Sequence, residues 1–239
     1  MPKQDCLVFQ IITLQFEIAE KMIEYSGITA PYLANNLEVD HIASPIINAR
    51  MSHDPNLLSL ETHTHSESNN VPANEKHAFY AIRYYGNGSE NQDFILNKKP
   101  YRNASILLSG TNFGIGSMQV MATARLLECG FRIVVAQSFG PTFFEDSVNM
   151  GLLPIQVSSE DVSYLAEQIY KTPDIDLTVN LEKQVLTRKG SSPIWFSLND
   201  RVRDQFIHGS ADKSILATYE EQVKNSKEDY LEQRPWIQE

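Results

Sequence analysis

The segment Gly110–Ala122 constrains the fold of this chain more than any other. It holds three glycines within seven residues. The apolar run Ile106–Leu108 before it predicts a buried strand, and apolar residues at helical spacing after it, up to Gly130, predict a helix. We therefore expect a strand, a glycine-rich turn and a helix with Ser117 at its N-cap.

This turn has two interpretations. Glycines let the backbone approach a ligand closely, and the free N–H groups at the start of a helix favour an anion. The same residues also suit a plain tight turn closed by a capping serine. A glycine-rich turn alone does not decide between a binding site and a simple connection.

Apolar patterns elsewhere predict alternating strands and helices. The expected strands are 6–12, 78–85, 133–136, 154–157 and 195–198, with an exposed hairpin over 175–187. The expected helices are 14–27, 141–150 with Pro141 in its first turn, one after the capping box Ser158–Asp161, one from Asn199 to Gly209, and 211–232. With no internal repeat or linker, this order predicts one layered α/β domain over residues 1–239.

Two segments stand apart from this pattern. The N-terminal extension, about residues 1–27, carries a helical apolar face that either packs on the core or docks a second copy as a homodimer. Residues 51–78 are rich in Ser, His, Asn, Glu and Pro and predict a long exposed loop. The spacing of His63 and His65 suits a metal, but no cysteine lies beside them, and we expect no metal site in this chain.

Composition excludes several classes of function. The net charge is −10 without a basic run, so we expect no nucleic acid partner. No apolar run reaches the roughly 18 residues of a membrane helix. Cys6 and Cys129 can form neither a disulfide framework nor a four-thiolate site. Asp5 and the lack of a cleavage site argue against a signal peptide, so we expect a cytoplasmic protein.

A polar loop over residues 36–45 places Asp40 and His41 side by side. Such a pair is common in ordinary turns. It also suits an acid/base or orienting role, because both side chains exchange or hold protons.

Several motifs match one family. Asn112–Ser117 is similar to the motif Asn-Phe-Gly-Cys-Gly-Ser, and Asp40–Pro45 is similar to the Asp-His-Ile-Ser motif of aconitase. With these and five further segments the chain resembles the small subunit of isopropylmalate dehydratase, which corresponds to the swivelling fourth domain of aconitase. The further segments are 94–110, 130–139, 149–155 and, near the C-terminus, 212–215 and 234–236. The resemblance covers about residues 28–239 and implies a three-layer β/β/α swivelling domain.

The resemblance also implies a chemistry. In the family this domain closes over a larger subunit that holds a [4Fe-4S] cluster, and together they reversibly dehydrate a small hydroxy di- or tricarboxylate. By resemblance, Ser117 would act as the base in its alkoxide form. Asn112, Gly114 and Gly116 would line the substrate site.

The chain departs from the family at the substrate ligands. A carboxylate-binding serine is Met118 here, and the arginine after it is Gln119. A neutral amide cannot replace the bidentate fork of arginine, and losing such a buried contact costs about 2–5 kcal/mol. Arg50 lies near the position of the family's other carboxylate-binding arginine. Met118 and Met121 either line an apolar mouth for a larger substrate or belong to the core.

Three functions follow from these residues. The first is a stand-alone, cofactor-free biosynthetic enzyme of the isomerase, cyclase or lyase type that binds an apolar intermediate. Ser117, Asp40 and His41 would be catalytic, while Asn112, Gly114, Gly116, Met118, Gln119 and Arg50 would bind the substrate. The second is the small subunit of a [4Fe-4S] hydro-lyase with a separate large subunit. The third is a non-catalytic regulatory paralogue.

Overall fold

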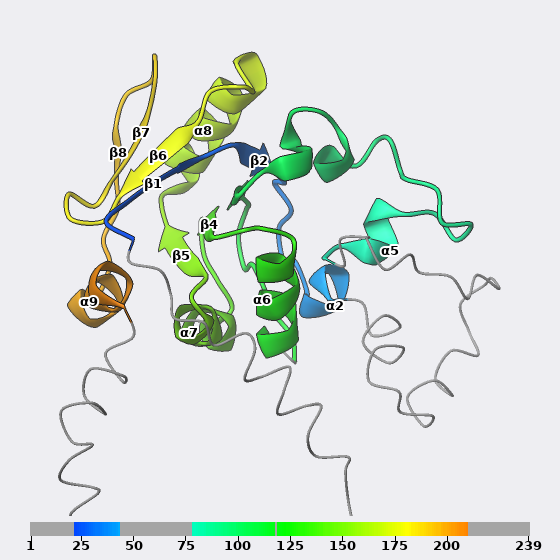
Figure 1. Cartoon of the computed structure of the whole chain (residues 1–239), viewed down its shortest axis with the longest axis horizontal. Coiled ribbons are helices and arrows are strands. Elements are labelled where there is room, and N and C mark those ends of the chain that lie inside the picture. The colour runs from blue at the N-terminus through cyan, green and yellow to red at the C-terminus, as the bar shows by residue number, and fades with distance from the viewer. Residues whose placement is uncertain (1–21, 44–77, 118, 210–239) are drawn as a thin grey trace, which may run out of the picture.

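The computed structural model describes residues 22–43, 78–117 and 119–209, which form two four-stranded sheets and their helices (Figure 1). One sheet is parallel, in the order β2, β3, β4, β5. Its strands are β2 (Thr29–Pro31), β3 (Ile106–Leu108), β4 (Ile133–Ala136) and β5 (Leu153–Gln156). Nearly every residue in these strands is buried, as expected for a parallel sheet that is covered on both faces.

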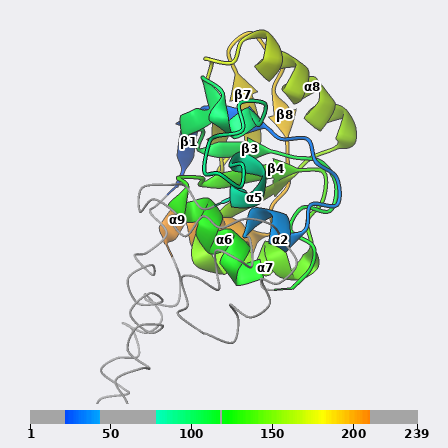
Figure 2. The same cartoon turned by 90° about the vertical axis from the view of Figure 1, so that its right-hand side faces the viewer.

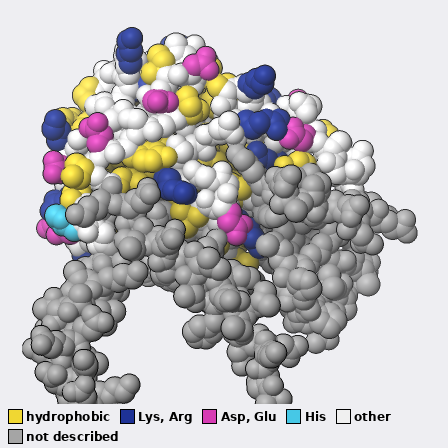
Figure 3. Space-filling model, viewed as in Figure 1, with side chains coloured by type: hydrophobic (Ala, Val, Ile, Leu, Met, Phe, Trp, Pro, Cys, Tyr) yellow, Lys and Arg dark blue, Asp and Glu magenta, His cyan; other side chains and the backbone are white. Residues whose placement is uncertain are grey.

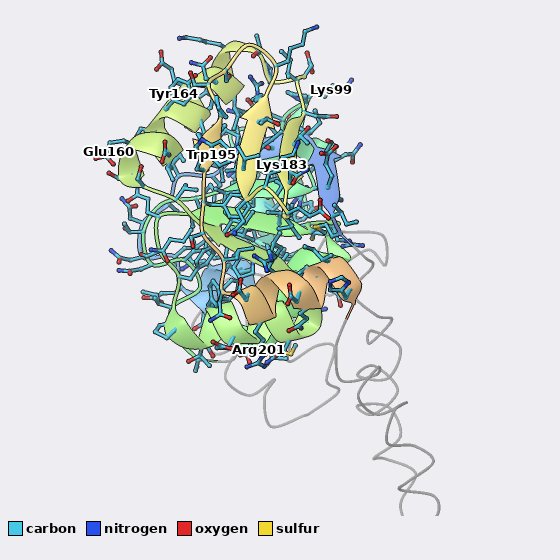
Figure 4. The ribbon with its side chains drawn as sticks, turned by 90° about the vertical axis from the view of Figure 1, so that its left-hand side faces the viewer. Lys99, Glu160, Tyr164, Lys183, Trp195 and Arg201 are labelled. Atoms are coloured by element: carbon cyan, nitrogen blue, oxygen red, sulfur yellow. The ribbon has the colours of Figure 1, made fainter. Side chains whose placement is uncertain are left out.

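The second sheet is antiparallel, in the order β1, β6, β7, β8. Its strands are β1 (Glu24–Gly27), β6 (Leu177–Asn180), β7 (Val185–Arg188) and β8 (Ile194–Trp195). Buried and more exposed residues alternate along β6, because only one face of this sheet packs on the core. Trp195 in the edge strand β8 is 66% exposed (Figure 4).

Helices complete a three-layer arrangement. Figure 2 shows α6 (Gln119–Glu128) and α7 (Pro141–Met150) on one side of the parallel sheet, with β7, β8 and α8 (Ser159–Lys171) on the other. The short helix α2 (Val39–Ile42) packs beside α6. The remaining helical elements are α5 (Tyr80–Arg83), η2 (Ile95–Asn97), η3 (Tyr101–Asn103) and α9 (Asp200–His208). The expected α/β fold with β/β/α layers is confirmed.

Local signals placed several helix boundaries correctly. Pro141 begins α7, and Gly151 ends it in the left-handed conformation with φ 85°. The Ser158 side chain accepts a hydrogen bond from the backbone N–H of Asp161, as a capping box requires. Asn199 caps α9 in a similar way, by accepting from the N–H of Arg201.

Other expectations were wrong. The predicted helix over 14–27 does not extend to Gly27, because residues 24–27 form β1 and pair with β6. Residues 78–85 contain helix α5 instead of a strand, because Phe79 takes a left-handed backbone, with φ 62°, and turns the chain. The loop around Asp40 contains α2. The hairpin is not exposed throughout, since Leu177 and Val179 of β6 are fully buried.

Some expectations lie outside the described residues. These are the strand over 6–12, the first part of the N-terminal helix, most of the loop 51–78 and the helix over 211–232. Among the described residues, no helix is long and apolar enough to cross a membrane. On the face shown in Figure 3, positive and negative side chains of the described residues are interspersed.

Candidate functional site

The candidate site lies where three strands of the parallel sheet end. The strands β2, β3 and β4 run in the same direction, so their carboxyl ends meet at one edge of the sheet. The loop before α2 follows β2, the glycine-rich turn follows β3, and residues 137–140 follow β4. In open α/β sheets, ligands bind outside this edge.

Backbone hydrogen bonds tie the glycine-rich turn to both neighbouring loops. On one side, the N–H groups of Gly114 and Ile115 donate to the carbonyl of Leu37 at 2.8 and 3.2 Å, and Val39 donates to Ile115 at 2.8 Å. On the other side, Phe113 donates to the carbonyl of Ser138 at 3.0 Å. The turn is therefore held as the middle segment of three, although it is not a regular strand.

The two glycines predicted to line the site have different surroundings. Gly114 is buried with φ 74°, and a Cβ there would lie 2.4 Å from the ring of Phe143. Gly116 is exposed with φ 113°, and a Cβ there would meet no atom nearer than the Val39 nitrogen at 3.8 Å. The first glycine makes room for packing, whereas the second leaves open backbone that a ligand can approach.

Ser117 is exposed at the start of α6. The described part of α6 begins at Gln119, and residue 118 lies outside the described residues, so the N-cap role of Ser117 stays a prediction. The left-handed Gly116 keeps the backbone out of the helix there. Among the described residues, the Ser117 hydroxyl has no hydrogen-bond partner. It therefore faces solvent beside a helix N-terminus, where partial positive charge favours an anion.

Gln119 and Met121 occupy the first turn of α6. The Nε2 group of Gln119 donates a hydrogen bond to the carbonyl of Gly116, so this amide links the first turn of α6 to the glycine-rich turn before it. Met121 is partly buried and packs against the core, which agrees with the core alternative for that residue. Between them, Val120 is 50% exposed. Met118 and Arg50 lie outside the described residues.

Asp40 and His41 are both exposed in α2. The hydrogen bond from Val39 to Ile115 joins the first residue of α2 to the glycine-rich turn. The structure thus brings the segments that carry Asp40 and Ser117 together. It shows no hydrogen bond between the side chains of Asp40, His41 and Ser117.

The side chain of Asn112, a predicted substrate ligand, is hydrogen-bonded to two neighbouring loops. Its Nδ2 donates to Oδ1 of Asn36 at 2.7 Å, and its Oδ1 accepts from the hydroxyl of Ser138 at 3.2 Å. The same hydroxyl accepts from the backbone N–H of Asn112 at 2.8 Å. Sequence reasoning missed Asn36 and Ser138. The only signal was a pair of asparagines, Asn35 and Asn36, in a loop that tolerates left-handed backbone.

An aromatic cluster holds the other side of α2. Tyr32 follows β2 and packs edge-on against Phe79 and Phe94, with ring centroids 5.4 and 5.3 Å apart. Burial raises the pKa of the Tyr32 phenol. Phe79 donates its N–H to the carbonyl of Ile42, the last residue of α2, at 2.8 Å. The helix is thereby anchored at both ends.

The described residues do not suit an iron–sulfur cluster. They contain no group of three or more His, Cys, Asp and Glu side chains that could hold a metal ion. Cys129 is buried, and its Sγ accepts a hydrogen bond from the N–H of Ala78 at 3.3 Å. No thiolate set is available within this part of the chain.

Comparisons with known proteins agree with the fold, and the matched residues include the glycine-rich turn. Residues 58–160 match the model of the aconitase C-terminal domain. The 3-isopropylmalate dehydratase small subunit of Bacillus licheniformis is 36% identical over 162 residues, which are 67% of this chain and 79% of that protein. The one from Mesorhizobium japonicum is 35% identical over 158 residues, 66% of this chain and 79% of that protein.

A solved structure supports the fold alone. The 3-isopropylmalate dehydratase structure from Methanocaldococcus jannaschii superimposes with a TM-score of 0.52 at 18% identity, covering 87% of this chain and 99% of that one. The relatives are small subunits, and none of these comparisons supports the stand-alone, cofactor-free enzyme that we expected first. With 36% identity across most of a curated relative, the chain belongs to the 3-isopropylmalate dehydratase small-subunit family, within the aconitase C-terminal domain group.

Proposed function

We propose that this chain is the small subunit of a hydro-lyase, which works with a separate larger subunit on a hydroxy-carboxylate substrate. The observation that carries this proposal is the exposed Ser117 beside the start of α6, on a turn held by both neighbouring loops. Family membership adds to it, since the relatives are named as small subunits of a dehydratase.

Ser117 would move the proton. In dehydration its alkoxide would accept a proton from the substrate carbon, and in hydration its hydroxyl would return that proton. The N-terminus of α6 favours the negative form by about 0.3–1 kcal/mol at an exposed position. This effect alone is too small to ionise a serine, so closure against a larger subunit, which excludes water, is part of the proposal.

The first turn of α6 would bind an uncharged part of the substrate. Gln119 is neutral, and its amide already donates to the carbonyl of Gly116. Val120 beside it is 50% exposed and apolar. We therefore propose that this side of the site receives an apolar or neutral group, while Arg50 binds a carboxylate.

The larger subunit would hold the cluster. The described residues offer no thiolate set, and Cys129 is buried away from the turn within the core. A cluster bound by a partner would serve as a Lewis acid toward substrate oxygen. This chain would supply the proton-transferring hydroxyl and the shape of the pocket.

The test is anaerobic purification of the tagged chain from its native source, followed by mass measurement, visible absorption and turnover of hydroxy-carboxylates. We expect a complex heavier than the 27.1 kDa chain, with cluster absorption. Ser117→Ala should assemble normally and lose about 10²–10⁴-fold in kcat. Ser163→Ala, on the exposed surface of α8, is the matched control and should keep full activity.

Two results would overturn the proposal. Turnover by the isolated, colourless chain would establish a stand-alone enzyme. A stable complex that turns over no hydroxy-carboxylate, and whose assembly Ser117→Ala leaves unchanged, would establish a regulatory role.

A further inference from the structure

Asn36 and Asn112 share an unusual backbone conformation. Their φ angles are 52° and 54°, in the left-handed region that residues other than glycine seldom adopt. Asparagine tolerates it because its short amide can hydrogen-bond locally. Here the two amides meet, and Nδ2 of Asn112 donates to Oδ1 of Asn36 at 2.7 Å. Two strained positions therefore stabilise each other.

This pair stands at one end of a ladder between the loop before α2 and the glycine-rich turn. The N–H of Asn36 donates to the carbonyl of Thr111 at 2.8 Å. The ladder continues through the carbonyl of Leu37 and ends with the bond from Val39 to Ile115 at 2.8 Å. Its register decides which residue of one segment lies opposite which residue of the other.

The far end of the ladder adjoins the predicted catalytic residues. Asp40 follows Val39 directly, and Ser117 follows Ile115 by two residues. The figures show α2 beside α6 in both views (Figures 1 and 2). A slip or opening of the ladder would change the position of Ser117 relative to Asp40.

Asn112 is also held from its other side. Ser138 accepts from the N–H of Asn112 at 2.8 Å and donates to its Oδ1 at 3.2 Å. Both polar groups of the Asn112 amide thus have protein partners. Because its amide is already hydrogen-bonded to the protein, Asn112 is better suited to holding the two loops in position than to binding substrate.

We propose that Asn36 and Asn112 form a positioning pair, which fixes the register of the glycine-rich turn against α2 and thereby places Ser117 relative to Asp40 and His41. Asn36 is the residue that no motif pointed to. The catalytic part of this inference rests on the proposed function, whereas the structural part does not.

The first measurement follows the ladder itself, by amide hydrogen exchange at Gly114, Ile115 and Val39 in the purified chain. Asn36→Gly keeps the left-handed backbone and removes only the amide. We expect exchange at these amides to become about tenfold faster, the effect of losing one hydrogen bond. Gln184→Gly is the matched control, because Gln184 has φ 51° and its side chain also accepts a hydrogen bond, in a hairpin of the other sheet. It should leave the three amides unchanged.

The second measurement is turnover of the assembled complex. Asn36→Gly should lower kcat about 10- to 100-fold with little change in KM, as a misplaced group does. Asn36→Asp keeps the acceptor oxygen and should restore most of kcat. If Asn36→Gly fails to fold, Ser138→Ala tests the other side of Asn112 with the same measurements.

Each outcome bears on the proposal. Faster exchange with lower kcat and rescue by aspartate supports it. Lower kcat with unchanged exchange would show that Asn36 touches the substrate, and faster exchange with unchanged kcat would show that the ladder does not place Ser117. If the wild-type complex has no turnover, the proposed function fails, while exchange still decides whether the pair sets the register.

Discussion

Gly114 faces the ring of Phe143 so closely that a Cβ on the glycine would lie 2.4 Å from the aromatic carbons. Gly114→Ala should therefore destabilise the protein through overpacking, by about 1–3 kcal/mol, added to the strain of a left-handed alanine. Gly130→Ala carries the same strain, with φ 93°, but meets no atom within 4 Å. Urea unfolding of both variants separates the two effects. Equal loss in both would show that the Phe143 ring yields.

The start of α8 depends on Ser158. Its hydroxyl accepts from the N–H of Asp161 at 3.1 Å and donates to the Asp161 carboxylate at 2.7 Å. Ser158→Ala should lower the free energy of unfolding by about 1 kcal/mol. Ser163→Ala removes a hydroxyl from the surface of the same helix and should change stability by less than about 0.5 kcal/mol. Similar losses of unfolding free energy in the two variants would mean that the Ser158 cap stabilises the helix no more than an ordinary surface hydroxyl does.

The buried Arg83 relies on Asn97 for a partner. Arg83 is 2% exposed, and its Nε donates to Oδ1 of Asn97 at 2.9 Å. Asn97→Ala should cost about 1–3 kcal/mol, because the buried Nε of Arg83 loses its acceptor, although Nη2 still donates to the Leu96 carbonyl at 3.0 Å. Asn87→Ala, in an exposed turn nearby, is the matched control. Thermal unfolding of both variants checks this, and an unchanged midpoint for Asn97→Ala would contradict it.

Local patterns predicted the elements whose structure is decided locally. The run Ile106–Leu108 is apolar throughout, and it forms the fully buried strand β3. The capping residues of α8 and α9 are adjacent to the helices that they begin. Residues 24–27 were placed in a helix because their strand partner, β6, lies about 150 residues away in the sequence, and pairing with it overrides local propensity.

The same limit applies to the site. Motifs made Ser117, Asp40 and the glycines candidates for the site, because these residues match motifs of the family. They could not identify Asn36 as the partner of Asn112, because the bond joins residues 76 positions apart and depends on how the two loops approach. They also assigned Gly114 to ligand binding, whereas only the fold shows that Phe143 fills the space beside it.

The ion pair of Glu90 and Arg102 should make stability depend on pH. Hydrogen bonds from the Arg102 guanidinium, at 2.6 and 2.5 Å, hold the pKa of the Glu90 carboxyl below its usual range. The unfolded chain therefore takes up the proton first on acidification. The stabilisation is complete above the unfolded pKa and is lost as the pH falls through the folded pKa.

Arg102→Gln should thus be less stable than the wild type at neutral pH, by no more than about 1 kcal/mol because solvent screens this pair. The difference should shrink as the solution is acidified below the ordinary pKa of glutamate. Urea unfolding across this range measures it, and added salt should reduce it at neutral pH. A difference that stays constant with pH would show that Arg102 acts through packing and its hydrogen bond to the Asn97 carbonyl, and not through the ion pair.

Gln119 should decide whether the site accepts a carboxylate at the start of α6. Under the proposed function, Gln119→Arg gives up the hydrogen bond to the Gly116 carbonyl and supplies a fork that binds a carboxylate in two places. We expect kcat/KM of the complex to shift toward substrates with a second carboxylate, at the expense of those with an apolar group there. Ser163→Arg is the control, because it adds the same positive charge on the exposed surface of α8, a helix that carries none of the candidate site residues. It should leave the substrate preference unchanged. An equal shift with Ser163→Arg would show that added positive charge, and not a fork at the start of α6, changes the preference.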